Sequence, residues 1–170
     1  KELTSDYFKL KKIPKNIFNF CTKGVKFIEY PPEIFKFINR ICKLIKNHKN
    51  NCFMTIDYGY YDDNFKNTLQ ALKKHQKVSI FHEPGNTDIT HLVNFKFISR
   101  ILKKNGLTRT LNMSQSDFLI KYGILLRLEQ AKKSLTSKKN KIKLNMAVNR
   151  LIDSQKMGNL FKVLLVTNEN

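Results

Sequence analysis

The sequence predicts an α/β fold, in which helices cover the faces of a sheet of strands. Three observations lead to this prediction. Short apolar runs bounded by turn residues alternate along the chain with segments whose apolar residues recur at helical spacing. The run at 52–57 is apolar on both faces, which is typical of a strand that helices cover on both sides. The chain has 170 residues, the length of one domain or of part of one.

The first elements are a strand, a helix and a second strand. Apolar and polar residues alternate at 24–30, and the two prolines that follow end this strand. A helix is expected at 33–47, because its isoleucines recur every three to four residues. A turn then leads into the strand at 52–57, which we expect in the centre of the sheet.

The middle of the chain is expected to be a long loop over 58–87, with one helical turn near 68–74. Loops of this length inside a domain are usually functional or mobile. Asp88 or Thr90 is expected to cap the helix that follows, and Gly106 is expected to end it.

The last third is expected to hold a strand, two helices, an insertion and a final strand. Ser114 and Asp117 form a loose capping box that opens the first of these helices, and Gly123 closes it. We therefore predict one domain, 1–170. Its sheet and flanking helices are 24–133 (with a strand at 107–111) and 157–166, and 134–156 is a polar linker (134–143) plus a helical insertion (144–153).

The chain is strongly basic, with a formal net charge of +19 and a pI of about 9.9. Such a charge can indicate an acidic partner, such as nucleic acid or a membrane surface. However, only five of the 32 basic residues are arginines, and the lysines are spread along the chain among many asparagines and isoleucines. We therefore favour the interpretation that these are solvated surface lysines, which an AT-rich genome encodes frequently, over the interpretation that they form a binding site for a polyanion.

Several catalytic and metal-binding motifs are missing from the sequence. The three cysteines have no short paired spacing, which argues against a disulfide framework and a structural zinc site. There is no H-E-x-x-H, no P-loop, no nucleophile elbow and no G-x-G-x-x-G. No apolar run has the length of a membrane span and no signal peptide is visible, so a reducing interior is the expected location.

The first candidate site is Asp57-Tyr58-Gly59, at the predicted end of the central strand. Open α/β sheets bind ligands at the carboxyl ends of their strands. Asp57 could accept hydrogen bonds from a ligand, and Gly59 would let the chain turn and approach that ligand closely. The alternative is a turn aspartate that satisfies its own backbone. Tyr60 and Tyr61 could line a groove with Tyr58 and stack on nucleic-acid bases.

Three other candidates are less specific when taken alone. Asp88 and Thr90 could bring a helix N-terminus to a ligand, or they could simply cap that helix. Glu29 could hold a guanidinium as a bidentate pair, or it could be an exposed residue before a turn. His75 or His82 could act as a general base, although surface histidines are the more common case.

Taken in order, a series of short motifs resembles the MidA family of class I S-adenosylmethionine-dependent methyltransferases from bacteria and mitochondria. The likeness covers about residues 24–166. The sequence departs from the family at Asn94, where aspartate is usual, and at His91 and Leu92. The matching segments are Gly24-Val25 with Glu29 and Pro31; Ile56-Asp57-Tyr58-Gly59; Thr68-Leu69-Gln70-Ala71 with His75; Pro84-Gly85 with Asp88-Ile89-Thr90, Val93 and Phe95; Gln115 with Phe118-Leu119 and Gly123-Ile124; and Met157-Gly158 with Phe161-Lys162-Val163-Leu164.

The resemblance implies a Rossmann-like methyltransferase sheet, of which this chain carries the later strands, with a final antiparallel strand and flanking helices. It implies transfer of a methyl group from S-adenosylmethionine to a protein nitrogen. Arginine is the implied acceptor, and a respiratory complex I subunit is a candidate substrate. The family's glycine-rich cofactor loop and acidic ribose-binding residue have no counterpart in this sequence. We expect them upstream of Lys1, so the chain alone is expected to be inactive.

The same resemblance implies roles for the candidate residues and a location for the protein. The location is the bacterial cytoplasm, or the mitochondrial matrix in a eukaryote. A nucleic-acid-binding module and an inactive remnant of the enzyme are the two alternative functions. No metal is expected, and the oligomeric state is left open. The catalytic candidates are Asp57 and Glu29, and the substrate-binding candidates are Tyr58, Gly59, His75, Asp88 and Thr90.

Overall fold

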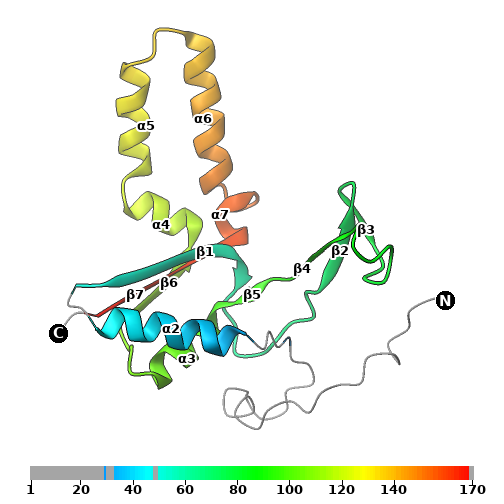
Figure 1. The fold of residues 1–170 in the computed structure, drawn as a ribbon. Helices are drawn as coiled ribbons and strands as arrows, with labels where there is room; N and C mark the ends of the chain where they lie inside the picture. The colour runs from blue at the N-terminus through cyan, green and yellow to red at the C-terminus, as the bar shows by residue number, and fades with distance from the viewer. Residues whose placement is uncertain (1–28, 30–32, 48–49, 169–170) are drawn as a thin grey trace.

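The computed structural model describes residues 29, 33–47 and 50–168 (Figure 1). Apart from Glu29, the strand predicted at 24–30 lies outside these residues, as do the two prolines that follow it. The described elements form a four-stranded sheet, a three-stranded sheet and flanking helices. The predicted α/β fold is confirmed.

The main sheet has the strand order β5-β1-β7-β6. β1 and β5 are parallel, whereas β7 runs antiparallel to both of its neighbours, as predicted for the last strand. The prediction that the central strand ends at Asp57 is wrong, because the pairing of β1 with β7 continues through Tyr58, which lies opposite Phe161. The strands are β1 (Cys52–Tyr60), β5 (Val93–Asn94), β6 (Thr110–Ser114) and β7 (Phe161–Thr167).

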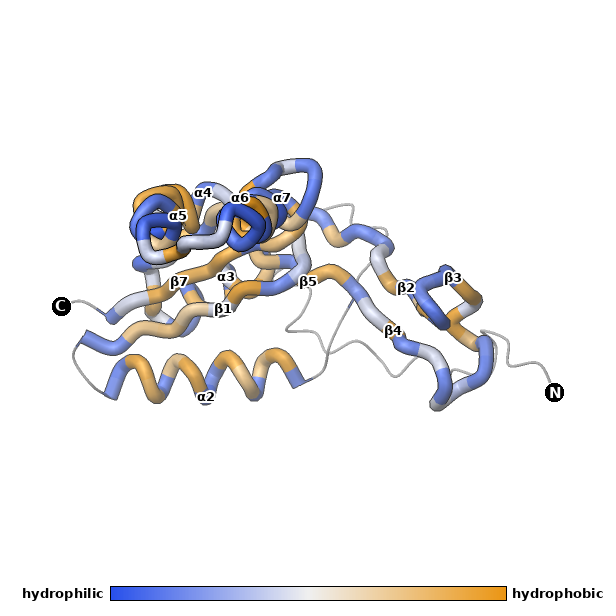
Figure 2. Tube along the Cα trace, turned by 90° about the horizontal axis from the view of Figure 1, so that it is seen from above, coloured by the Kyte–Doolittle hydropathy of each residue, from blue (hydrophilic) through white to orange (hydrophobic). Residues whose placement is uncertain are grey.

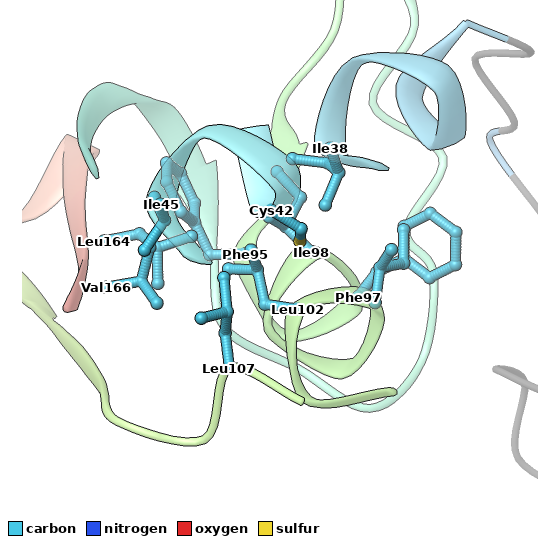
Figure 3. Close-up of a cluster of buried hydrophobic side chains, with 11 residues drawn as sticks. Ile38, Cys42, Ile45, Phe95, Phe97, Ile98, Leu102, Leu107, Leu164 and Val166 are labelled. Carbon is cyan, nitrogen blue, oxygen red and sulfur yellow. The ribbon is translucent and has the colours of Figure 1, made fainter. Parts of the chain in front are cut away.

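The core lies between one face of this sheet and the helices α2 (Ile34–Lys46) and α3 (Phe95–Lys104) (Figure 3). The isoleucine stripe predicted at 33–47 forms the inward face of α2. The other face of β1 is less covered than predicted, since Met54 and Ile56 are 48% and 39% exposed. The buried side chains are Ile38, Cys42, Ile45, Phe95, Phe97, Ile98, Ile101, Leu102, Leu107, Leu164 and Val166.

Four helices lie on the side of the sheet opposite α2 (Figures 1 and 2). They are α4 (Gln115–Lys121), α5 (Ile124–Lys133), α6 (Lys138–Ile152) and α7 (Met157–Leu160). Half of the predicted capping box is present. The Asp117 N–H donates to Ser114 Oγ over 3.0 Å, but the Asp117 carboxylate accepts a hydrogen bond from Ser114 Oγ rather than from the Ser114 N–H. α6 starts six residues earlier than predicted, because Ser137 caps it and the lysines that follow are good helix formers.

None of the helices in the described part of the chain is long and apolar enough to cross a membrane.

The segment predicted as a long loop instead contains a small antiparallel sheet that extends away from the main sheet (Figure 1). Its strands are β2 (Gln70–Lys73), β3 (Gln76–Val78) and β4 (Asp88–Thr90), in the order β3-β2-β4. We call this sheet the arm. The helical turn predicted at 68–74 is therefore wrong. So is the helix predicted to open at Asp88 or Thr90, because β4 pairs with β2 and Asn94 caps α3.

Candidate functional site

A cavity of about 220 Å³ lies beside the ends of β1 and β5, the parallel pair of the main sheet. The carboxyl ends of parallel strands lie at one edge of a sheet, where open α/β sheets bind their ligands. The walls are mainly apolar, with a few polar groups among them. The lining residues are Glu29, Ile34, Tyr60, Phe65, His91, Leu92, Val93, Asn94, Phe97 and Ile98.

Glu29 supplies the carboxylate of this cavity, and its side chain is 13% exposed. Its Oε1 accepts hydrogen bonds from the N–H groups of Thr68 (2.6 Å) and Leu69 (2.9 Å), and its Oε2 accepts one from Thr68 Oγ1 (2.7 Å). Thr68 Oγ1 in turn accepts a hydrogen bond from the N–H of Leu92 over 2.9 Å. Glu29 therefore ties the segments before β2 and before β5 to the cavity, although they lie far apart in the sequence.

Tyr60 and Asn94 stand at the ends of the two parallel strands, and both are buried. The Tyr60 hydroxyl accepts a hydrogen bond from the Lys66 N–H over 3.0 Å. Burial raises the pKa of the Tyr60 phenol, and the hydrogen bonds from the Lys66 N–H and the Asn94 side chain only partly oppose this effect. The phenol is therefore neutral at physiological pH, so it can donate a hydrogen bond to a ligand.

His91 lies at the mouth of the cavity and is exposed. Its Nδ1 is 3.2 Å from the Leu92 carbonyl oxygen and 4.0 Å from Glu29 Oε2. His91 therefore lies beside the Glu29 oxygen that accepts a single hydrogen bond.

Gly59 packs tightly against other groups of the protein. It does not turn the chain as predicted but lies inside β1, opposite Val93 of β5. A Cβ at this position would be 2.4 Å from the Val93 carbonyl oxygen and 2.5 Å from Cε2 of Phe95. Glycine thus permits the close approach of β5 and of the Phe95 ring. The predicted role of Gly59 in substrate binding stays a prediction.

Asp57 and Tyr58, the other residues of the predicted strand-end motif, do not line the 220 Å³ cavity. Both are exposed within β1, and the Asp57 carboxylate accepts a hydrogen bond from the N–H of Tyr58 over 2.7 Å. The Tyr58 ring packs on Phe161, with ring centroids 4.0 Å apart. This hydrogen bond matches the alternative interpretation, in which the Asp57 side chain bonds to the neighbouring backbone, although both residues lie in a strand rather than in a turn.

The remaining predicted substrate-binding residues lie on the arm. Asp88 and Thr90 belong to β4 and are exposed, and His75 occupies the tight turn between β2 and β3 with φ 64°. None of these three lines the cavity beside β1 and β5. Their predicted role in substrate binding stays a prediction.

The three tyrosines that could have formed one nucleic-acid groove have different surroundings. Tyr58 packs on Phe161 and Tyr60 lines the cavity, whereas Lys96 Nζ lies over the Tyr61 ring at 4.8 Å. No group of three or more His, Cys, Asp or Glu side chains that could hold a metal ion occurs among the described residues.

Sequence reasoning placed Tyr60 only in a possible nucleic-acid groove, and it did not assign His91 or Asn94 to a ligand site. A signal was present for two of them, because His91 and Asn94 are the positions at which the chain departs from its family. Thr68, which fixes Glu29, was visible only as part of a matching motif. Its partner could not be found, since the two residues are 39 positions apart.

The cavity is too small to hold a whole S-adenosylmethionine molecule. Sites for ligands of that size usually have about 300–1,000 Å³, whereas this cavity has about 220 Å³. The described residues also offer no glycine-rich turn beside a strand end, since other groups of the protein occupy the space beside Gly59. A cavity of this volume has room for a group the size of one amino-acid side chain.

The chain resembles proteins of known sequence and structure. It is 28% identical over 134 residues to "Protein arginine methyltransferase NDUFAF7 homolog, mitochondrial" from Caenorhabditis elegans, a match that covers 79% of this chain and 30% of that protein. An uncharacterised protein from Burkholderia thailandensis has a similar crystal structure, with a TM-score of 0.71 and 25% identity over 86% of this chain and 41% of that one.

A second Burkholderia thailandensis structure, solved with bound S-adenosyl-homocysteine, matches with a TM-score of 0.63 and 26% identity over 79% of this chain and 35% of that one. The chain thus spans well under half the length of these relatives. Residues 3–113 match a family model described as "Putative S-adenosyl-L-methionine-dependent methyltransferase". The resemblance to MidA proteins is confirmed, and the chain belongs to this family of S-adenosyl-L-methionine-dependent methyltransferases.

Proposed function

We propose that this chain forms the substrate side of a protein methyltransferase, and that its cavity receives an arginine side chain. The observation that carries the proposal is the partly buried carboxylate of Glu29 in a cavity lined in part by aromatic rings. A guanidinium is planar, stacks on aromatic faces and pairs with carboxylates, so it suits such walls. The printed name of the Caenorhabditis elegans relative, a protein arginine methyltransferase, supports the same acceptor.

Glu29 can hold this acceptor without losing its structural hydrogen bonds. Oε1 already accepts two hydrogen bonds, but Oε2 accepts one, from Thr68 Oγ1. A carboxylate oxygen has two acceptor sites, so Oε2 can take one N–H of a guanidinium on the side that faces His91. In this arrangement Glu29 orients the substrate nitrogen, and the neutral Tyr60 hydroxyl lies in the same cavity.

We propose that the cofactor is held by residues outside this cavity, because the cavity is too small for it and the sequence has no G-x-G-x-x-G. On this proposal the chain alone binds the acceptor but does not catalyse transfer. Asp57 remains a catalytic candidate on the sequence motif alone. A respiratory complex I subunit as substrate, in the mitochondrial matrix or the bacterial cytoplasm, is proposed from the resemblance to MidA proteins.

Nuclear magnetic resonance of this chain, titrated with N-acetyl-arginine amide, tests the acceptor. We expect the amide signals of Tyr60, His91 and Asn94 to shift with the arginine compound and much less with N-acetyl-lysine amide. Glu29→Gln should weaken the response at least several-fold, and Glu83→Gln, at an exposed carboxylate on the arm, should not. Equal responses to arginine and lysine would contradict the proposal.

Calorimetric titration of the same chain with S-adenosylmethionine tests where the cofactor is held. We expect no saturable heat. A saturable heat of binding would show that this chain contains the cofactor site, and it would overturn that part of the proposal while leaving the acceptor site untouched.

A further inference from the structure

The helices α5 and α6 form an antiparallel hairpin that projects from the main sheet (Figure 1). The two helices are joined at the far end by the short connection 134–137. Val148 is 9% exposed between them, whereas Met146 on α6 is 67% exposed and Leu125 on α5 is 47% exposed. Apolar side chains of this protruding element are therefore exposed rather than in a core. Hydrophobic residues occur along both helices (Figure 2).

Some of these side chains line a groove between the two helices. The groove has a volume of about 340 Å³, and α5 contributes Leu125 and Leu128 to it. α6 contributes residues at spacings of three and four, which place them on one helical face: Asn145, Met146, Asn149 and Ile152. Ile142, which is 50% exposed, continues this face toward the tip of the hairpin.

The hairpin also carries a large excess of positive charge. Residues 124–152 contain eight lysines and arginines and a single acidic residue, Glu129. Glu129 pairs with Lys132 over 2.6 Å, which leaves the other seven cations without a carboxylate partner among the described residues. Lys138 lies one turn before Ile142 on the groove side of α6, and Arg150 lies one turn after Met146.

We propose that this groove binds an amphipathic helix of a partner protein, one whose flanks carry Asp and Glu. Apolar side chains at i, i+3, i+4 and i+7 would fill the groove, and a third helix would complete a small bundle. Acidic residues beside the apolar stripe would face the cations of α5 and α6, which steers association and selects the partner. The inference does not depend on the proposed methyl transfer.

Other occupants fit the hairpin less well. Single-stranded nucleic acid would use aromatic side chains for stacking, and residues 124–152 contain no Phe, Tyr, Trp or His. A second copy would bring the same positive charge to the groove. A membrane surface favours a convex apolar face, whereas here Leu128 and Val148 are set back between two helices, with Asn145 and Asn149 beside them.

The test is fluorescence anisotropy at about 150 mM salt, where long-range attraction between exposed charges is screened. The probe is a labelled 18-residue peptide with Leu at i, i+3, i+4 and i+7 and Glu at most other positions. A peptide of the same composition with its leucines out of helical register has the same charge. We expect the first peptide to bind this chain at least tenfold more tightly than the second.

Variants of the chain then locate the site. Ile142→Lys combined with Met146→Lys adds positive charge but removes the apolar contacts, so we expect at least a tenfold loss of affinity for the first peptide. Ile89→Lys, at a 58% exposed position on the arm, is the matched control and should change little. Circular dichroism checks that each variant keeps its helix content.

Four results would overturn the proposal. The first two are equal affinity for the two peptides and retained binding of the first peptide after the double substitution. The third is tighter binding of single-stranded RNA or of phosphatidylserine vesicles to the same residues of the hairpin. The fourth is a dimer, seen in sedimentation, that the double substitution dissociates.

Discussion

Gly59→Ala tests the tight contact between β1 and β5. The added Cβ would lie 2.4 Å from the Val93 carbonyl oxygen, and carbon–oxygen contacts are rarely closer than about 3.3 Å. The strand pair must therefore move by nearly an ångström, and the Phe95 ring, which would lie 2.5 Å from the same Cβ, must move as well. Phe95 is only 1% exposed, and Val93 is paired directly with Gly59, so neither group has room to yield.

Forced overpacking of this kind costs about 1–3 kcal/mol, and alanine recovers about 0.5–1 kcal/mol relative to glycine in a strand. Since both neighbours are held, we expect a net loss of about 2 kcal/mol in the free energy of unfolding. For a chain of this size that corresponds to a melting temperature lower by about 4–8 °C. Urea denaturation followed by circular dichroism measures the loss, and heating measures the temperature.

A double substitution distinguishes the steric effect from a general loss of stability. In a Phe95→Leu background the two ring contacts are gone, so Gly59→Ala should cost at least about 0.5 kcal/mol less than it does in the original chain. A cost that is equal in both backgrounds, or a Gly59→Ala variant as stable as the original, would refute the proposed contact.

Three other substitutions or reactions should give defined results. Glu29→Gln replaces one carboxylate oxygen by an amide NH2 group, which cannot accept the hydrogen bonds that Thr68 now donates. We therefore expect a loss of about 1–3 kcal/mol in the free energy of unfolding and faster hydrogen exchange at the Thr68 amide. Unchanged exchange at that amide would contradict the network. Ser114→Ala removes the cap of α4 and should cost about 1 kcal/mol by urea denaturation, with no change expected if the cap is unimportant. Burial raises the pKa of the Cys42 thiol above its ordinary value. Unfolding therefore releases a proton at pH values above about 9, and stability should fall as the pH rises through that range. Peptide mapping after alkylation at pH 8 should show Cys42 reacting far more slowly than the exposed Cys52, and equal rates would argue against its burial.

The parts of the fold with strong local signals could be predicted from the sequence. The isoleucines of α2 mark a buried helical face, and Ser114 and Gly123 mark the ends of α4. In each case the deciding interaction lies within a few residues. The antiparallel last strand came from the family resemblance rather than from the residues of β7 themselves.

The arm could not be predicted, because its strands are short and their stability comes from pairing. β2 contains Gln70-Ala71-Leu72-Lys73, a composition equally suited to a helix. The turn between β2 and β3 uses Lys74 and His75 at positive φ, where Asn-Gly would have given a clear signal. The cavity was missed for a related reason, since Glu29 and Thr68 meet only in the folded chain.

The position of β7 between β1 and β6 also constrains synthesis of the protein. Cys52 is paired with Thr167 across more than a hundred intervening residues, and β1 and β6 do not pair with each other. During synthesis on the ribosome, the edge of β1 that will pair with β7 therefore stays unpaired while the arm and the helical hairpin are made. Unpaired strand edges favour aggregation. A nonsense codon between Ser114 and Phe161 would leave the edges of β1 and β6 without their partner, so such truncated products should be degraded by proteases instead of accumulating as partly folded domains.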